Sequence, residues 1–303
     1  MDVIQTTGLT KYYGRSKVVD QVHLRVRQGD IYGFIGRNGS GKSTTLKMIS
    51  GLVWPDAGDI ELFGQKHISD HIRRRMGVLV EEAGIYPNFS AYHNLLFKAE
   101  LMGLTDARQR VGEVIERLGL KNAGKKKVKT FSMGMKQRLG IALAIVGKPD
   151  LLILDEPING LDPEGISDIR HMIVKLNEEE HMTILISSHI LGELSKIATC
   201  YGIIKDGQLI EQMTDEQLRE KCQDYMYVRV DQPKKASVLL EQRLGLRNYQ
   251  IRPGGEIRIF GYADTAAVNT AFADGHVAVK SLYMHAMDLE TYFLERMGGE
   301  YDV

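Results

Sequence analysis

A glycine-rich segment in the first fifth of the chain constrains its fold more than any other feature. The segment reads Gly36-Arg37-Asn38-Gly39-Ser40-Gly41-Lys42-Ser43. This is the phosphate-loop pattern: a glycine, four residues, then Gly-Lys-Ser. An apolar run, Ile31–Ile35, precedes it and a helical pattern, Lys42–Leu52, follows it, as such a loop requires. A chance glycine-rich turn is the alternative, but the strand and helix on either side favour a phosphate-binding loop in an α/β fold.

Each residue type in this loop has a chemical reason to be there. Glycines permit backbone angles that turn successive N–H groups inward, and a helix N-terminus adds its positive dipole end. Lys42 is expected to reach the β- and γ-phosphates of ATP, and the Ser43 hydroxyl to bind Mg²⁺. The expected nucleotide contacts are consecutive: Gly36, Arg37, Asn38, Gly39, Ser40, Gly41, Lys42, Ser43 and Thr44.

Two adjacent carboxylates follow a second apolar run. The run Leu151–Leu154 is followed by Asp155, Glu156 and Pro157. Ligand sites in parallel sheets lie at the carboxyl ends of the strands, so Asp155 is expected to hold Mg²⁺. Glu156 is then placed to polarise a water molecule for attack on the γ-phosphate. Two solvated acids at a strand end are the alternative, and the phosphate loop favours the metal site.

The order of the expected elements indicates a parallel sheet with crossover helices in the first two thirds of the chain. Short apolar strands at 31–35, 151–154 and 182–186 alternate with helical patterns within 92–119, at 132–146 and at 166–176. The alternating segment Val18–Val26 predicts one further, half-buried strand. After about residue 216 the pattern changes to strands at 225–230 and 256–260 and helices at 238–244 and 265–272, which predicts a small α+β domain.

Composition favours a soluble, cytoplasmic protein. Lys and Arg together number 39, as do Asp and Glu, so the formal net charge is zero, and no nucleic acid is expected as a partner. The longest apolar stretch, Leu139–Gly147, is far shorter than the about 20 residues of a membrane-spanning helix. The N-terminus shows no secretory signal, and the only two cysteines form no disulfide framework.

Further motifs make the family recognisable. The segment Phe131–Arg138, which reads Phe-Ser-Met-Gly-Met-Lys-Gln-Arg, resembles the signature motif of ATP-binding cassette (ABC) ATPases. Asn159–Asp162 resembles the D-loop of that family, and His189, after Ser187 and Ser188, its switch histidine. Tyr13 resembles the aromatic residue that stacks on adenine. The motifs stand in the order of the family and cover roughly residues 1–215.

The resemblance implies a fold and a division of the chain. Residues 1–215 are expected to form an ABC-type ATPase domain with a parallel-sheet core, an antiparallel β subdomain and a helical subdomain at about 86–148. Residues 216–303 are expected to form the small C-terminal α+β domain. Helix N-termini bind anions, so Ser132, at the start of a helix, suits a phosphate.

The resemblance also implies partners. Two ATP molecules would be sandwiched in a head-to-tail dimer of the chain, and integral membrane permease subunits would be bound at the inner face of the membrane. Glu156, His189 and Glu81 are the implied catalytic residues. His189 would contact the γ-phosphate, although a lone histidine after a strand is usually structural. The residues implied to reach the nucleotide across the dimer are Ser132, Gly134, Met135 and Asp162.

Two departures from the family pattern stand out. Met133 and Met135 replace a glycine and the glutamine of the common Leu-Ser-Gly-Gly-Gln signature, whereas Ser132 and Gly134 are kept. Glu81 takes the place of the usual Q-loop glutamine, where it would offer oxygen to Mg²⁺ or water while adding negative charge beside the γ-phosphate. An exposed loop acid without a role is the alternative for Glu81.

With a glutamate in this loop, the chain resembles the lantibiotic-immunity and bacitracin-resistance branch of the family. The segments Glu81–Tyr92 and Asp288–Glu295 fit the same branch. The leading hypothesis is therefore the ATPase subunit of an exporter that moves a peptide antibiotic, or another hydrophobic compound, away from the membrane. The second hypothesis is an ABC ATPase acting on ribosomes or DNA. A GTPase is a third, weaker option, because no Asn-Lys-x-Asp guanine motif occurs.

Overall fold

The computed structural model describes residues 1–66, 68–81, 83–120, 124–286 and 289–297. Glu82 and Asp288, which belong to the segments that resemble the exporter branch, lie outside the described residues. The chain divides into two compact units, Met1–Asp215 and Glu216–Val303. Within the described residues, no helix is both long enough and apolar enough to cross a membrane.

The first unit is organised around a six-stranded sheet. Its strand order is β10-β9-β4-β8-β7-β6, and all neighbours are parallel except β10 and β9. Its four central strands are almost entirely buried, as expected for a parallel sheet covered on both faces. The strands are β4 (Ile31–Ile35), β6 (Met76–Leu79), β7 (Leu151–Asp155), β8 (Thr183–Ser188), β9 (Cys200–Lys205) and β10 (Gln208–Thr214).

A smaller antiparallel sheet completes the first unit. Its central strand β1 pairs with the three others, which are β2, β3 and β5. Both sheets contribute to one apolar core, which includes Ile4, Phe34, Leu46 and Ile153. The bounds are β1 (Asp2–Tyr13), β2 (Ser16–Val22), β3 (Arg25–Arg27) and β5 (Ala57–Leu62).

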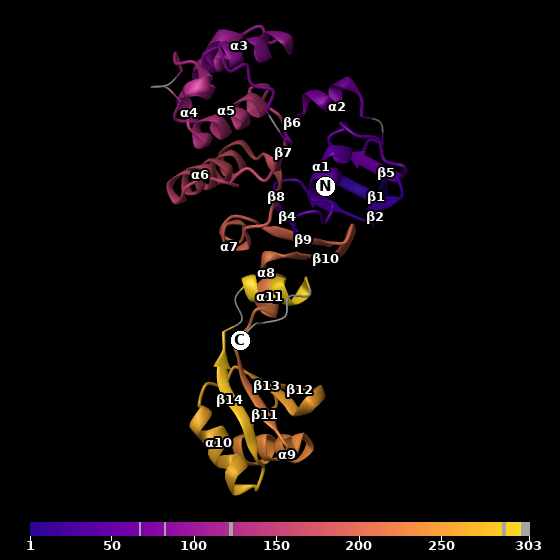
Figure 1. Ribbon diagram of the computed structural model, residues 1–303, viewed down its shortest axis with the longest axis vertical. Coiled ribbons are helices and arrows are strands. Elements are labelled where there is room, and N and C mark those ends of the chain that lie inside the picture. The colour runs from indigo at the N-terminus through magenta and orange to yellow at the C-terminus, as the bar shows by residue number, and fades with distance from the viewer. Residues whose placement is uncertain (67, 82, 121–123, 287–288, 298–303) are drawn as a thin grey trace. The chain divides into compact units, whose positions relative to one another are not determined.

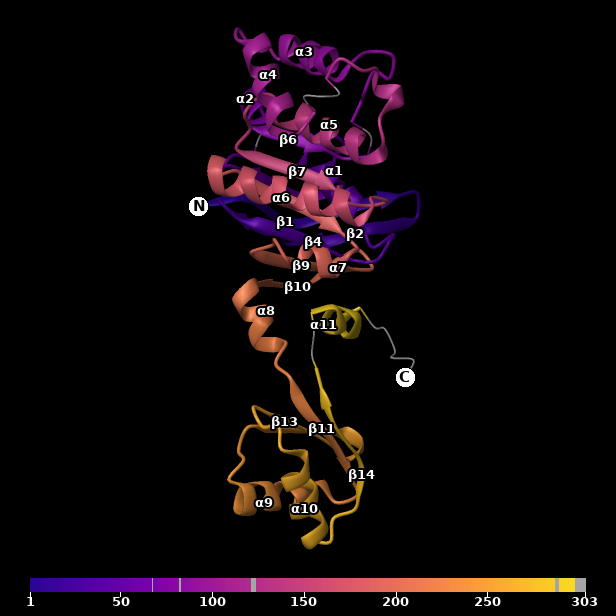
Figure 2. The same cartoon turned by 90° about the vertical axis from the view of Figure 1, so that its left-hand side faces the viewer.

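The helices of the first unit cover both faces of its large sheet, and some of them lie beyond the edge strand β6. In Figure 1, α6 lies on one side of the sheet and α1, with the smaller sheet, on the other, while α3, α4 and α5 gather beyond β6. Figure 2 shows α6 lying across the sheet. The bounds are α1 (Lys42–Ile49), α2 (Asp70–Arg74), α3 (Ala91–Leu101), α4 (Ala107–Arg117), a 3₁₀ turn (Val128–Thr130), α5 (Met133–Ile145), α6 (Pro163–Glu180) and α7 (Leu191–Leu194).

The second unit contains a four-stranded antiparallel sheet of order β12-β13-β11-β14. With α9 and α10 as crossovers, this is the split βαβ arrangement. The apolar core of this unit includes Met226, Val228, Ile257, Ile259 and Phe272. The bounds are α8 (Asp215–Lys221), β11 (Tyr225–Val230), α9 (Pro233–Leu244), β12 (Tyr249–Arg252), a 3₁₀ turn (Pro253–Gly255), β13 (Glu256–Phe260), α10 (Thr265–Asp274), β14 (Val279–His285) and α11 (Leu289–Arg296).

Some predicted elements differ from the observed ones. The single strand predicted at Val18–Val26 is wrong: β2 ends at Val22 and β3 begins at Arg25. Both strands pair with β1, and between them the Thr6 hydroxyl donates to Val22 O (3.0 Å) and accepts from Leu24 N (2.8 Å). The buried Thr6 hydroxyl thus bridges the ends of the two strands, while Thr6 N also donates to Leu24 O at 2.9 Å. Alternation of apolar residues does not reveal such a break.

Two predicted helices have different ends. The helix expected to reach Leu52 stops at Ile49, because Gly51 adopts the left-handed φ of 72° that commonly follows a helix C-terminus. The helix predicted at 166–176 instead runs from Pro163 to Glu180. Its first turn is capped by the Asp162 side chain, which accepts from Gly165 N at 3.0 Å. The residues at both ends of this second helix show no apolar periodicity, so the sequence pattern revealed only the middle of the helix.

Candidate functional site

The phosphate loop joins β4 to α1 at the carboxyl edge of the large sheet. Gly39 and Gly41 have φ values of 81° and 104°, which side-chain-bearing residues rarely adopt. Ser40 is buried, and its hydroxyl has no hydrogen-bond partner within the described residues. A buried polar atom without a partner is costly unless a ligand satisfies it. The loop therefore has a shape and an unused polar atom that fit a phosphate oxygen.

Close packing makes glycine necessary at the first position of the loop. A Cβ on Gly36 would lie 2.5 Å from the Ile204 carbonyl oxygen of β9, closer than real Cβ contacts allow. By contrast, a Cβ on Gly112, in the middle of α4, would meet nothing within 4 Å. The loop therefore lies directly against the backbone of the sheet.

We expect Gly36→Ala to lower the free energy of unfolding by about 1–3 kcal/mol, because the new methyl group clashes with fixed backbone. ATP affinity should fall as well. Thermal unfolding and nucleotide titration measure the two effects. Gly112→Ala is the matched control and should raise stability by up to about 1 kcal/mol, because alanine favours the helix. Equal stability of the two variants would contradict the close packing of the loop.

The lysine of the loop is buried, and neighbouring polar and charged groups compensate its positive charge. Lys42 is only 5% exposed, and its Nζ donates to the carbonyl oxygens of Gly36 (2.7 Å) and Arg37 (3.3 Å). The same Nζ lies 3.2 Å from Glu156 Oε1. A buried ammonium is stable only with such partners. These contacts hold the ammonium beside the loop, where it can meet the phosphates of a nucleotide.

Asp155 ends β7 and Glu156 follows it directly, beside β8. Asp155 is paired in register with Ser187, whose hydroxyl donates to Asp155 Oδ1 (2.5 Å) and accepts from Glu156 N (2.9 Å). Glu156 has a left-handed φ of 48°, and its Oε2 contacts His189 Nδ1 at 2.8 Å. The structure thus brings Lys42, Glu156 and His189 into one contact chain. Ser187, which the sequence showed only as a neighbour of His189, orients both carboxylate residues.

The signature residues line a separate cavity. Ser132 caps α5, and its hydroxyl accepts from Met135 N at 3.3 Å. Ser132 and Gly134 share the cavity with Asp162, the N-terminal cap of α6. Met135 is not among the described residues that line it, whereas Met133, which is 57% exposed, is. The structure therefore groups three of the four residues expected to reach a nucleotide across a dimer.

The remaining predicted residues lie at the borders of the site. Tyr13 ends β1 and is half exposed, with the Lys11 ammonium 5.8 Å from its ring centroid. Ser43 and Thr44 stand in the first turn of α1. Glu81 follows β6 and forms an ion pair with Lys47 of α1. Lys47 could not be identified from the sequence, because no local pattern links it to Glu81, which lies 34 positions further on.

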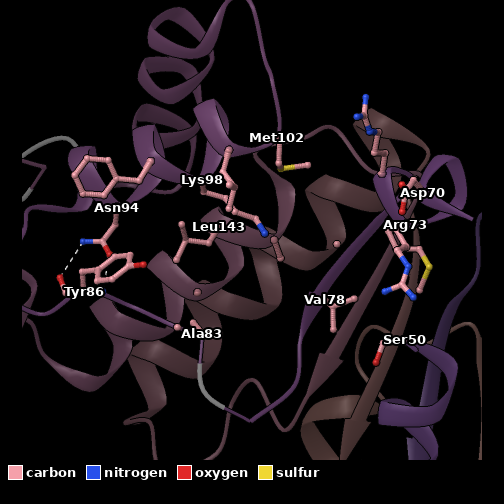
Figure 3. A pocket seen from close by; sticks show the side chains of 18 residues that line it. Ser50, Asp70, Arg73, Val78, Ala83, Tyr86, Asn94, Lys98, Met102 and Leu143 are labelled. Carbon is pink, nitrogen blue, oxygen red and sulfur yellow. Dashed lines mark hydrogen bonds between the residues drawn. The ribbon is translucent and has the colours of Figure 1, made fainter. Parts of the chain in front are cut away.

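A groove of about 620 Å³ opens where α2, β6, α3 and α5 meet (Figure 3). Figure 3 shows Lys98 extending into it from α3, with Arg73 and Asp70 of α2 on the opposite wall. Tyr86 O accepts from the Asn94 side chain at 3.1 Å and fixes the loop at one end of the groove. Of the four charged residues among the described lining residues, three are cationic: Arg73, Arg74 and Lys98. The floor, formed by residues of β6 and α5, is apolar.

Comparisons with known proteins agree with this geometry. The family model "ABC transporter" matches residues 19–159. The chain is 42% identical over 300 residues to the bacitracin transport ATP-binding protein BcrA of Bacillus licheniformis, covering 98% of each. It is 40% identical over 208 residues to the lantibiotic transport ATP-binding protein SrtF of Streptococcus pyogenes, covering 69% of this chain and 89% of that relative.

A solved structure supports the fold. It is a dimeric bacterial ABC transporter cassette, with a TM-score of 0.64 and 25% identity, and the match covers 70% of this chain and 98% of that one. The nucleotide-binding fold predicted from the sequence is thereby confirmed. The chain belongs to the ATP-binding proteins of ABC transporters and is an ABC ATPase.

Proposed function

We propose that this chain is the ATP-hydrolysing subunit of an ABC exporter that protects the cell from a peptide antibiotic. One observation carries the chemistry: the buried Lys42 ammonium contacts Glu156, which in turn contacts His189, directly beside the phosphate loop. This arrangement joins a phosphate-binding cation, a general base and a polar sensor in one chain of contacts. The names of the relatives, a bacitracin and a lantibiotic transport protein, support the cargo class.

The nucleotide phosphates would be held by the loop Gly36–Gly41 and by Lys42, with Thr44 beside them in the first turn of α1. The site also suits Mg²⁺, because Ser43, Asp155 and Glu81 supply the hard oxygen ligands that this ion prefers. When bound, Mg²⁺ neutralises phosphate charge. Asp155 is already oriented for such a role by the Ser187 hydroxyl.

Glu156 would act as the general base in hydrolysis. Its Oε1 is buried and has no hydrogen-bond partner within the described residues, although Lys42 lies 3.2 Å away. Once the Lys42 ammonium contacts the phosphates instead, that oxygen would be available to accept a proton from an attacking water molecule. His189, anchored to Oε2, would contact the γ-phosphate and respond to its loss. Tyr13 would stack on the adenine ring, for which its half-exposed ring is suited.

A second copy of the chain would complete the site. The cavity lined by Ser132, Gly134 and Asp162 lies at the N-termini of two helices, α5 and α6. Helix N-termini attract anions. In a head-to-tail pair this cavity would cover the nucleotide held by the partner's phosphate loop. Met135 would contribute through its position in the first turn of α5. The dimeric form of the similar cassette supports this assembly.

The groove of Figure 3 is the surface proposed for an integral membrane permease subunit. Its apolar floor and cationic walls suit a short amphipathic segment that carries acidic residues. Such a partner would hold the chain at the inner face of the membrane. The groove borders the loop that contains Ala83 and Gly84, close in sequence to Glu81, so nucleotide-driven movement of this loop would reach the permease.

Charge reversal in the groove should separate permease binding from nucleotide binding. We expect Arg73→Glu combined with Lys98→Glu to weaken capture of the permease about tenfold, because like charges would then face an acidic segment. Affinity for ATP should stay the same. Lys175→Glu, an exposed position on α6, is the control and should change neither property. Undiminished capture by the double variant would contradict this assignment of the groove.

The proposed function is tested by co-purification. The Glu156→Gln variant, tagged and trapped with ATP in its native cells, should bring down multi-span membrane proteins after gentle solubilisation. Deletion of those proteins should then raise sensitivity to bacitracin-type or lantibiotic-type peptides. Recovery of ribosomes or DNA without membrane proteins would overturn the exporter proposal and favour a role outside transport.

A further inference from the structure

The ion pair between Glu81 and Lys47 joins two segments that are distant in sequence, one of which is the helix that follows the phosphate loop. Glu81 lies in the loop after β6, and Lys47 lies on α1, the helix that starts at Lys42. The Glu81 side chain is 66% exposed, whereas that of Lys47 is only 23% exposed. The better-packed lysine is therefore the fixed partner, and it determines where the carboxylate lies.

The backbone at Glu81 makes this attachment necessary. Its φ is 62°, in the left-handed region, where a residue with a side chain is less stable than glycine. Glu81 also lines a cavity that includes Met133 and Lys136 of α5, so the loop has open space on that side. Without the ion pair, neither the backbone preference nor the packing around the cavity would hold the carboxylate against α1.

The position of the carboxylate matters for electrostatic reasons. A negative charge near the γ-phosphate repels ATP unless a cation compensates it. Lys47 supplies that cation from the same helix that carries Lys42 and Ser43. Mg²⁺, once bound, supplies a second compensating charge. The contribution of Lys47 is therefore largest when no metal is present.

We propose that Lys47 is a positioning residue that holds and neutralises the Glu81 carboxylate on α1, and so allows this ABC ATPase to carry a glutamate beside its nucleotide. The inference rests on the proposed nucleotide site and assigns a role to a residue outside its known motifs. It also explains how the chain tolerates the charge that Glu81 adds in place of glutamine. Lys47 acts through Glu81, and its effect disappears when that residue is uncharged.

A double-mutant cycle on ATP affinity tests the proposal. Equilibrium titration of the full chain with ATP is compared in EDTA and in Mg²⁺ for the wild type, Lys47→Met, Glu81→Gln and the double variant. In EDTA, Lys47→Met should weaken affinity by about threefold to fivefold, the size of one charge pair near a surface. In Mg²⁺ the loss should be smaller. The double variant should bind as tightly as Glu81→Gln alone.

Controls separate charge compensation from general effects. Lys47→Arg should keep wild-type affinity, because it keeps the cation. Lys66→Met removes one positive charge from an exposed lysine that pairs with Asp59 and Glu61, and it should leave affinity unchanged. Lys47→Gln serves as a second neutral variant if thermal unfolding shows that Lys47→Met is not folded.

Two outcomes would overturn the proposal in different ways. Equal weakening by Lys47→Met in the wild-type chain and in the Glu81→Gln variant would mean that Lys47 acts independently of the carboxylate. A wild-type chain that binds no ATP would instead refute the nucleotide site itself. The comparison between the single and double variants thus tests the role of Lys47 only when the site works.

Discussion

Replacing Glu156 by glutamine is expected to leave ATP binding intact and to slow hydrolysis by about 100-fold to 10,000-fold, the usual contribution of a general base. The amide keeps the size of the side chain and a hydrogen-bonding oxygen for His189, so the contact at 2.8 Å is largely preserved. It cannot accept a proton from water. Steady-state phosphate release, together with equilibrium nucleotide titration, measures the two properties separately.

A matched control exists on α6. Glu178→Gln changes the same functional group at an exposed position and should hydrolyse ATP at the wild-type rate. Loss of the negative charge beside Lys42 should, if anything, strengthen binding of the triphosphate in Glu156→Gln. Rapid turnover by the Glu156→Gln variant would show that another group activates the water molecule, and the assignment of the base would be wrong.

Lys42→Ala should weaken ATP binding by about 100-fold or more. The ammonium is expected to make charge-assisted hydrogen bonds to two phosphates, each contributing about 1.5–3 kcal/mol, and 1.4 kcal/mol corresponds to a factor of ten. The substitution also leaves the Glu156 carboxylate without its neighbouring cation, which adds repulsion toward the γ-phosphate. Titration with ATP in the presence of Mg²⁺ measures the loss.

Lys175→Ala, on the exposed face of α6, removes an equal charge and should bind ATP like the wild type. Thermal unfolding of both variants shows whether the Lys42→Ala chain remains folded. Affinity within about threefold of the wild type would be too small a change for a residue that contacts phosphates. In that case the loop Gly36–Ser43 would not be the phosphate site.

Several strands were predictable because burial on both faces leaves a continuous apolar run or burial on one face leaves an alternating one. Ile31–Ile35, Tyr225–Val230 and Glu256–Phe260 have their predicted bounds in the structure. Helix ends were less predictable. Ser132 is the cap of α5 rather than its first residue, because its side chain accepts from Met135 N while its own backbone is extended. Caps depend on individual side-chain bonds, which periodicity does not encode.

The candidate site shows the same difference between local and tertiary information. The phosphate loop and the Asp155–Glu156 pair were recognisable because their chemistry depends on consecutive residues at fixed spacing. The pairing of Glu81 with Lys47 was not, nor was the orientation of Asp155 by Ser187, 32 positions away. These contacts join segments that meet only when β4, which leads into α1, is aligned with β6, β7 and β8 in one sheet.

The sequence by itself determined the chemistry of this protein: a loop for phosphates, a strand ending in two acids, and motifs of the ABC family in their usual order. The tertiary structure alone decided which charges compensate one another. It brings Lys42 to Glu156, Lys47 to Glu81, and the cationic residues of α2 and α3 to one groove. The physical reason is that ion pairs and cavities depend on distance in space, whereas motifs depend on distance along the chain.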